Sequence, residues 1–183
     1  MMWMEAREPT RDEVLAQYGA AMHAAQQLEE SMAGLVGVAR ELSVHAQAGL
    51  DATEEWEKLE RLWEDVFTWS GGRLKRELGL AGHLGEDVER AIRARNLLAH
   101  HYLRDHATHL DAGSKRAEMA ARLRDAAERF QAVAASLEVE RMASMHAAGF
   151  TDDHVTTPSE ARRLRYYDPT LDDAVPPEPF AED

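Results

Sequence analysis

Residues 18–42 read YGAAMHAAQQLEESMAGLVGVAREL, and this stretch decides the fold class. Its apolar residues follow at steps of three and four: Tyr18, Met22, Ala25, Leu28, Met32, Leu35, Ala39 and Leu42. That is the period of one face of an α-helix. Upstream, Thr10 and Glu13 have the capping-box spacing that begins a helix. The sequence therefore predicts a long amphipathic helix that starts near Thr10.

Apolar residues at the same spacing predict three further helices, over residues 51–72, 86–109 and 114–149. Ser70 and the two glycines after it predict an end or kink of the second helix. Ser114 is the predicted N-cap of the last helix. No stretch alternates as a strand does. The sequence therefore predicts an all-α fold, an antiparallel bundle of four to five helices.

The chain of 183 residues suits one domain and a tail. We expect a flexible N-terminus over residues 1–9 and the bundle over residues 10–149. Residues 150–183 are rich in proline and acids, so we expect an acidic, mostly disordered tail. Within it, residues 161–167 are basic and aromatic, which leaves docking on the acidic body open beside a solvated segment.

The composition excludes several classes of protein. There is no cysteine, so disulfides and thiolate metal sites are excluded. The N-terminus lacks the pattern of a signal peptide, and no apolar run is long enough to cross a bilayer. We therefore expect a cytoplasmic protein without a membrane partner. The net charge of −13 argues against a large nucleic-acid footprint, although residues 90–104 hold four arginines and no acid.

The candidate site lies in residues 95–102, which read RNLLAHHY. An arginine stands five residues before a histidine at Arg40/His45, Arg95/His100, Arg104/His109 and Arg141/His146. Only the pair in residues 95–102 also has Asn directly after the Arg and Tyr two after the His. On a helix, Arg95 falls inside an apolar stripe made of Leu84, Val88, Ile92, Leu98, Ala99 and Tyr102. A guanidinium there must meet an acid, a carbonyl, a ligand or an opening in an interface.

This pattern resembles the signature of the HEPN superfamily of helical ribonucleases. It is closest to the toxin branch, whose motif is Arg, four to six residues, His, any residue and Tyr. The resemblance implies a HEPN-like helical bundle that works as a homodimer. It also implies an endoribonuclease that needs no metal or cofactor. Such an enzyme cleaves RNA through the 2′-hydroxyl to a 2′,3′-cyclic phosphate, as part of a toxin–antitoxin or phage-defence system.

The residue types suit that chemistry. His100 is the expected general base or acid, and Arg95 the expected phosphate clamp. Asn96 would orient its neighbours by hydrogen bonding. The resemblance places Tyr102 where a nucleotidyltransferase antitoxin modifies the motif. Three neighbouring side chains are expected to bind substrate: Arg93, His101 and Arg104.

Two other functions remain open from the sequence. In the first, the chain is a catalytically inactive HEPN-like dimeric interaction module, with Arg95 paired to an acid of a neighbouring helix and His100 a polar helix-edge residue. In the second, the bundle binds a metal through His101, Asp105 and His109, which are spaced four residues apart on one helix face.

The tail gives the first testable prediction. Truncation after Phe150 should leave helicity and the melting temperature nearly unchanged, because a proline-rich acidic segment cannot form a core. Circular dichroism of the full and truncated chains measures both quantities. A large loss of stability would show instead that residues 161–167 dock on the bundle.

Overall fold

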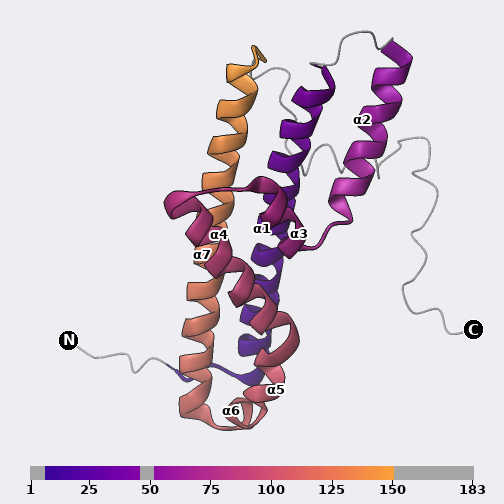
Figure 1. Cartoon of the computed structure of the whole chain (residues 1–183). Helices are drawn as coiled ribbons and strands as arrows, with labels where there is room; N and C mark the ends of the chain where they lie inside the picture. Colours follow the sequence, from indigo (N-terminus) through magenta and orange to yellow (C-terminus); the bar gives the residue numbers. More distant parts are fainter. Residues whose placement is uncertain (1–6, 46–51, 151–183) are drawn as a thin grey trace, which may run out of the picture.

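The computed structural model describes residues 7–45 and 52–150, and every regular element in them is helical (Figure 1). The predictions for residues 1–6 and 151–183 lie outside this part of the chain. The elements are α1 (Arg11–His45), α2 (Ala52–Phe67), α3 (Gly71–Leu78), α4 (Gly82–Leu97), the π-helix η1 (Leu98–Tyr102), α5 (Leu103–Asp105), α6 (Ala107–Asp111) and α7 (Gly113–Ala147). The predicted all-α class is confirmed for the described residues.

The capping box before α1 is confirmed. The Thr10 backbone N–H donates to Glu13 Oε2 at 2.7 Å, and the Glu13 N–H donates to Thr10 Oγ1 at 3.2 Å. These bonds satisfy two amide groups that a helix start would otherwise leave unpaired. The same hydrogen bonds, with Arg7 beside Glu13, lower the pKa of the Glu13 carboxyl.

The two long helices, α1 and α7, lie side by side and run in the same direction (Figure 1). At their N-terminal ends, the Arg116 guanidinium donates to the Pro9 carbonyl at 2.7 Å. These two helices are not successive in the chain. Because the short α3 lies between α2 and α4, α4 runs in the same direction as α2, and α7, which runs opposite to α4, is therefore parallel to α1 (Figure 1).

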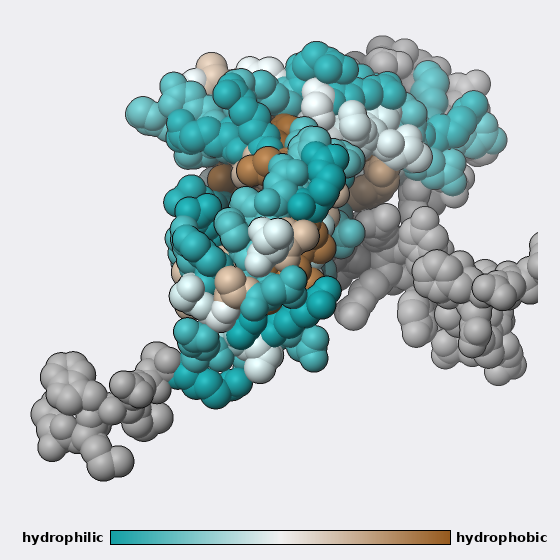
Figure 2. All heavy atoms as spheres, turned by 90° about the horizontal axis from the view of Figure 1, so that it is seen from below, coloured by the Kyte–Doolittle hydropathy of each residue, from teal (hydrophilic) through white to brown (hydrophobic). Residues whose placement is uncertain are grey.

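The core lies along the contact between α1 and α7, and each shorter helix adds to it. Its most fully buried side chains are Leu28, Met32 and Val36 from α1, Val66 from α2, Leu74 from α3, Val88 from α4, and Leu123, Phe130 and Leu137 from α7. Burying one such side chain contributes about 1.5–3 kcal/mol. The surface seen from below is mostly hydrophilic, but hydrophobic residues are visible in a hollow (Figure 2).

One predicted helix boundary, at Ser70, agrees with the structure, and the boundaries predicted for the last two helices differ from it. Ser70 caps α3 by accepting from the Arg73 N–H at 3.4 Å, as the predicted break requires. The predicted cap at Ser114 is wrong. The Ala112 carbonyl already accepts from the N–H groups of Lys115 and Arg116, so α7 begins at Gly113. The predicted helix over residues 86–109 starts earlier, at Gly82, and is interrupted after Leu97.

Within the described residues, no helix has both the length and the apolar character that a membrane span requires.

The core predicts a contrast between two identical substitutions. Leu123 is 0% exposed and Leu15 is 37% exposed. Leu123→Ala should lower the free energy of unfolding by about 2–5 kcal/mol, because it leaves a cavity. Leu15→Ala should change it by less than about 0.5 kcal/mol. Denaturant unfolding measures both values, and equal losses would contradict the position of the core.

Candidate functional site

The motif residues lie where the regular α-helix stops. Arg95 and Asn96 are in the last turn of α4, and His100, His101 and Tyr102 are in the π-helix η1. A π-turn has i→i+5 hydrogen bonds and occurs often at functional sites. Because the turn is wider, side-chain directions after Leu98 differ from those of an ideal α-helix.

Arg95 meets an acid of a neighbouring helix. Its Nε lies 3.0 Å from Glu29 Oε1, and its Nη2 donates to Glu29 Oε2 at 3.1 Å. Glu29 belongs to α1, so this two-point contact joins α1 to the end of α4. The two side chains are 29% and 25% exposed, which shields the pair from much of the solvent. The sequence left four kinds of partner open for Arg95, and the structure shows that it meets an acid, Glu29.

Two of the five N–H donors of Arg95 make hydrogen bonds with described residues. Glu29 Oε2 accepts one from Nη2 and Asn96 Oδ1 accepts one from Nη1 at 3.3 Å, while Nε is in ion-pair contact with Glu29 Oε1. A guanidinium has one donor on Nε and two on each terminal nitrogen. The described partners therefore leave one N–H on each terminal nitrogen of Arg95. Two such donors can bind two oxygens of a phosphate.

His100 is exposed and has no hydrogen bond or ion pair with the residues that the structure describes. Its nearest described aromatic neighbour is His101, with ring centres 6.3 Å apart. The Arg104 Nη2 donates to His101 Nδ1 at 2.6 Å. Since an arginine only donates, His101 Nδ1 accepts, and the ring proton of a neutral His101 is on Nε2.

Tyr102 is a core residue, 7% exposed. Its hydroxyl donates to the Met119 carbonyl at 3.4 Å, and its ring stacks on Tyr18 and meets the edge of His106. Burial raises the pKa of the Tyr102 hydroxyl, while the charge of Arg122 opposes this effect. Tyr102 therefore points into the bundle and His100 is on its surface.

The two outer arginines of the predicted site are exposed and pair with acids of their own helix. Arg93 contacts Glu89 one turn earlier, and Arg104 Nε contacts Asp105 at 3.1 Å. These contacts also hold the Glu89 carboxyl in its charged form, since Arg93 and Lys75 lower its pKa. Exposed pairs of this kind contribute little to stability, so an anionic ligand can replace either acid.

The structure thus joins some of the predicted residues and separates others. Arg95 and Asn96 are in direct contact, and so are His101 and Arg104. Between Arg95 and His100 there is no hydrogen bond, ion pair or ring contact in the described part of the chain. Sequence reasoning missed Glu29. A signal was available, because Glu29 follows Ala25 by four residues and precedes Met32 by three, inside the buried face of α1.

The possible metal cluster has no support among the described residues, where no group of three or more His, Asp or Glu side chains could hold a metal ion. His101 and Asp105 both contact Arg104 instead. His109 lies against His106, with ring centres 5.2 Å apart. The His106 Nδ1 is buried without a hydrogen-bond partner in the described part of the chain.

No protein-family model, curated protein or solved structure matches this chain.

The contact between Arg95 and Glu29 can be tested by a double-mutant cycle. Arg95→Ala and Glu29→Ala should each destabilise the fold, and their coupling energy should be about 1 kcal/mol or more, because the contact is two-pointed and partly shielded. The exposed pair Arg61 and Glu57 on α2 is the matched control, with an expected coupling of about 0.5 kcal/mol or less. Urea unfolding of the six variants and the parent measures both energies. A coupling near zero for Arg95 and Glu29 would contradict the contact.

Proposed function

We propose that the chain is a metal-independent endoribonuclease of HEPN type, with a HEPN-like bundle that works as a homodimer. The proposal starts from the sequence motif of residues 95–102. The structural observation that supports it best is how the Arg95 guanidinium is bonded. Glu29 and Asn96 hold the guanidinium in one orientation, and one N–H on each terminal nitrogen is left for a phosphate.

A fixed guanidinium is a better phosphate clamp than a mobile one. Charge builds up on the non-bridging oxygens as RNA is cleaved, and donors that are already oriented stabilise it without reorganising. Glu29 reduces the net charge of the site, but it leaves one N–H on each terminal nitrogen without a described partner. The planar fork of arginine suits this double contact, and the single ammonium group of lysine does not.

His100 supplies proton transfer in this mechanism. The 2′-hydroxyl of RNA attacks the adjacent phosphorus and loses its proton to a base, as the bond from phosphorus to the 5′-oxygen breaks. The 5′-oxygen takes up a proton, and the products are a 2′,3′-cyclic phosphate and a 5′-hydroxyl. An imidazole can both accept and donate a proton, so His100 can serve either transfer. A homodimer provides two such histidines, one for each step.

The remaining motif residues have supporting roles. Asn96 accepts from Arg95 and so limits rotation of the guanidinium. Arg93, Arg104 and His101 are exposed on the same helical segment and can contact phosphates beside the cleaved one. A toxin role would add a nucleotidyltransferase antitoxin that modifies Tyr102. The Tyr102 hydroxyl is buried against the Met119 carbonyl, so that modification needs the surrounding packing to open first.

The same geometry favours one alternative, a dimeric interaction module without catalysis. In that case the contact of Arg95 with Glu29 is a structural tie between α1 and α4, and Tyr102 is an ordinary core residue. The two functions differ in one respect that can be measured: only the ribonuclease needs His100.

The deciding experiment is RNA cleavage by folded protein in EDTA. His100→Ala should lower the rate by roughly 10²- to 10⁴-fold, the usual contribution of general acid–base catalysis. Arg95→Ala should be comparably severe, and Arg95→Lys should restore little activity. EDTA should have little effect on the wild type. Cleavage is followed on a gel, with detection of the cyclic phosphate end.

His109 is the internal control, since it follows Arg104 by five residues but lacks the neighbouring Asn and Tyr. His109→Ala and the corresponding change of His146 should leave the rate near that of wild type. Each variant must first match the wild type in helicity. A folded wild type that cuts no RNA would overturn the proposed ribonuclease, and so would a fully active His100→Ala variant.

A further inference from the structure

A pocket adjoins the proposed phosphate clamp, at the corner where α2 passes into α3 and packs on α1. Its volume is about 390 Å³. Glu29, which holds Arg95, is part of its wall. Beside Glu29, the wall of this corner pocket includes Gln26 and Glu30 of α1, Phe67 and Trp69 at the corner, and Leu74 of α3. A ligand in the corner pocket therefore lies one side chain away from the Arg95 guanidinium.

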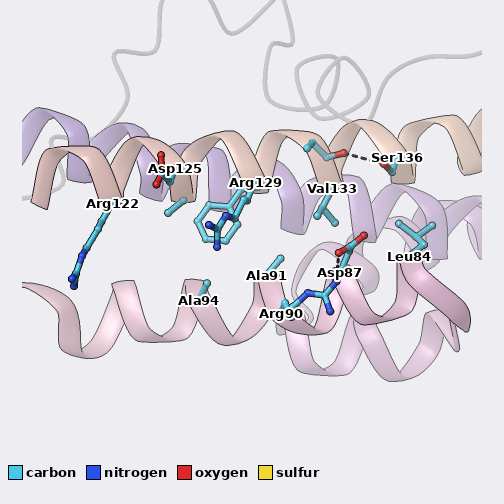
Figure 3. A pocket seen from close by; sticks show the side chains of 13 residues that line it. Leu84, Asp87, Arg90, Ala91, Ala94, Arg122, Asp125, Arg129, Val133 and Ser136 are labelled. Carbon is cyan, nitrogen blue, oxygen red and sulfur yellow. Dashed lines mark hydrogen bonds and ion pairs between the residues drawn. The ribbon is translucent and has the colours of Figure 1, made fainter. Parts of the chain in front are cut away.

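The corner pocket differs in charge from the wider groove between α4 and α7 (Figure 3). That groove has a volume of about 430 Å³, and Asp87 in its wall is paired with Arg90 of the same helix. Arginines and aspartates are mixed along the groove, so it favours neither sign of charge. The charged groups that line the corner pocket are carboxylates only. The corner pocket therefore selects for a ligand that donates hydrogen bonds.

Trp69 adds one hydrogen-bond donor to the wall of the corner pocket. Its side chain is 7% exposed, and its Nε1 is buried without a hydrogen-bond partner in the described part of the chain. The guanidinium groups of Arg73 and Arg40 lie over the ring, 3.6 Å and 4.7 Å from its centre, and restrain the indole. A buried donor without an acceptor is unfavourable, so an acceptor brought by a ligand is favoured there.

Glu29 and Glu30 bring hydrogen-bond acceptors to the same pocket. Both oxygens of Glu29 contact Arg95, and a Cβ added to Gly71 would lie 2.9 Å from Glu29 Oε1, so the Glu29 carboxylate is closely confined. Glu30 is then the better acceptor for a ligand. A carboxylate has about four lone-pair sites, so it can accept from a ligand and still keep contacts within the protein.

This set of groups complements guanine among the four RNA bases. The Watson–Crick edge of guanine has one acceptor, O6, next to two donors, N1–H and the 2-amino group. Adenine and cytosine have one donor group on this edge, and uracil has one between two acceptors, so none of them presents two adjacent donors to a carboxylate. Proteins that read single-stranded RNA bond to this edge and pack the base against aromatic side chains.

We infer that the corner pocket binds a guanine base of the RNA substrate, next to the phosphate that Arg95 holds. The inference rests on the proposed ribonuclease and gives it a base preference. Trp69 Nε1 donates to O6 of the base, and the Glu30 carboxylate accepts from N1 and from the 2-amino group. Phe67 provides an apolar wall for the ring. Because Glu29 belongs both to the pocket and to the clamp, the bound base and the held phosphate are neighbours.

Binding of mononucleotides to the full chain tests the pocket without RNA cleavage. In isothermal titration calorimetry, guanosine monophosphate should bind at least roughly tenfold more tightly than the adenosine, cytidine and uridine monophosphates. All four share one sugar and one phosphate, so the difference measures the base alone. Inosine monophosphate lacks the 2-amino group and should bind roughly tenfold more weakly than guanosine monophosphate.

Two substitutions test the two sides of the hydrogen-bond pattern. Trp69→Phe keeps an aromatic ring and removes the N–H, and Glu30→Gln keeps the shape and replaces one carboxylate oxygen by a donor. Each should weaken the binding of guanosine monophosphate by roughly tenfold, with helicity unchanged. Trp63→Phe is the matched control and should bind like the wild type, because Trp63 Nε1 donates to Glu41 at 3.2 Å and Trp63 does not line the pocket.

Several outcomes would overturn the corner pocket as a guanine site. They are equal affinity for the four nucleotides, no binding of guanosine monophosphate at millimolar concentration, unchanged binding by Glu30→Gln, and a loss in Trp63→Phe as large as in Trp69→Phe. The nucleotides are not cleaved in these measurements, so the two proposals can fail separately. Base-selective binding by a protein that cuts no RNA would overturn only the ribonuclease, and RNA cleavage without selective binding would overturn only the pocket.

Discussion

The mutual burial of the apolar faces of α1 and α7 is the interaction on which the rest of the structure depends. Leu28 and Met32 of α1 and Phe130 and Leu137 of α7 have almost no exposed surface. Each helix has 35 residues, so their contact runs the length of the molecule. The short helices have fewer apolar residues, and they pack against the surface of this long pair. The position of α4, and so of the candidate site, follows from that surface.

Arginines fix details that apolar packing leaves undetermined. Arg116 joins the segment before α1 to the turn before α7, through the carbonyls of Pro9 and Leu110. Arg141 is only 3% exposed and is held by Glu138 one turn earlier on α7. Arg95 joins α4 to α1. A guanidinium keeps its charge at any physiological pH, so each of these buried or half-buried groups requires fixed oxygens around it. Directional contacts of this kind select one alignment among the many that hydrophobic burial would permit.

Much of the fold could be predicted from residue spacing, because local hydrogen bonds decide it. Thr10 with Glu13, and Ser70 before two glycines, mark helix ends through contacts within four residues. The direction of α7 relative to α1 could not be predicted, since it depends on how α3 and its following loop turn the chain. The sequence predicts only the kinds of group that Arg95 can meet. Identifying Glu29 as its partner requires knowing that α1 lies against α4.

The π-turn at Leu98–Tyr102 has a consequence for how this segment tolerates changes in length. A wide turn accommodates one residue more than an α-helical turn over nearly the same rise. Deleting a single residue there could restore an unbroken α-helix from α4 into α5 and leave the helix axis in place. A one-residue insertion or deletion in a regular α-helix would instead rotate everything after it by about 100°. The chain between Arg95 and Tyr102 is thus a point where an insertion or deletion can be absorbed by a change of helix type, while the surrounding core stays in register.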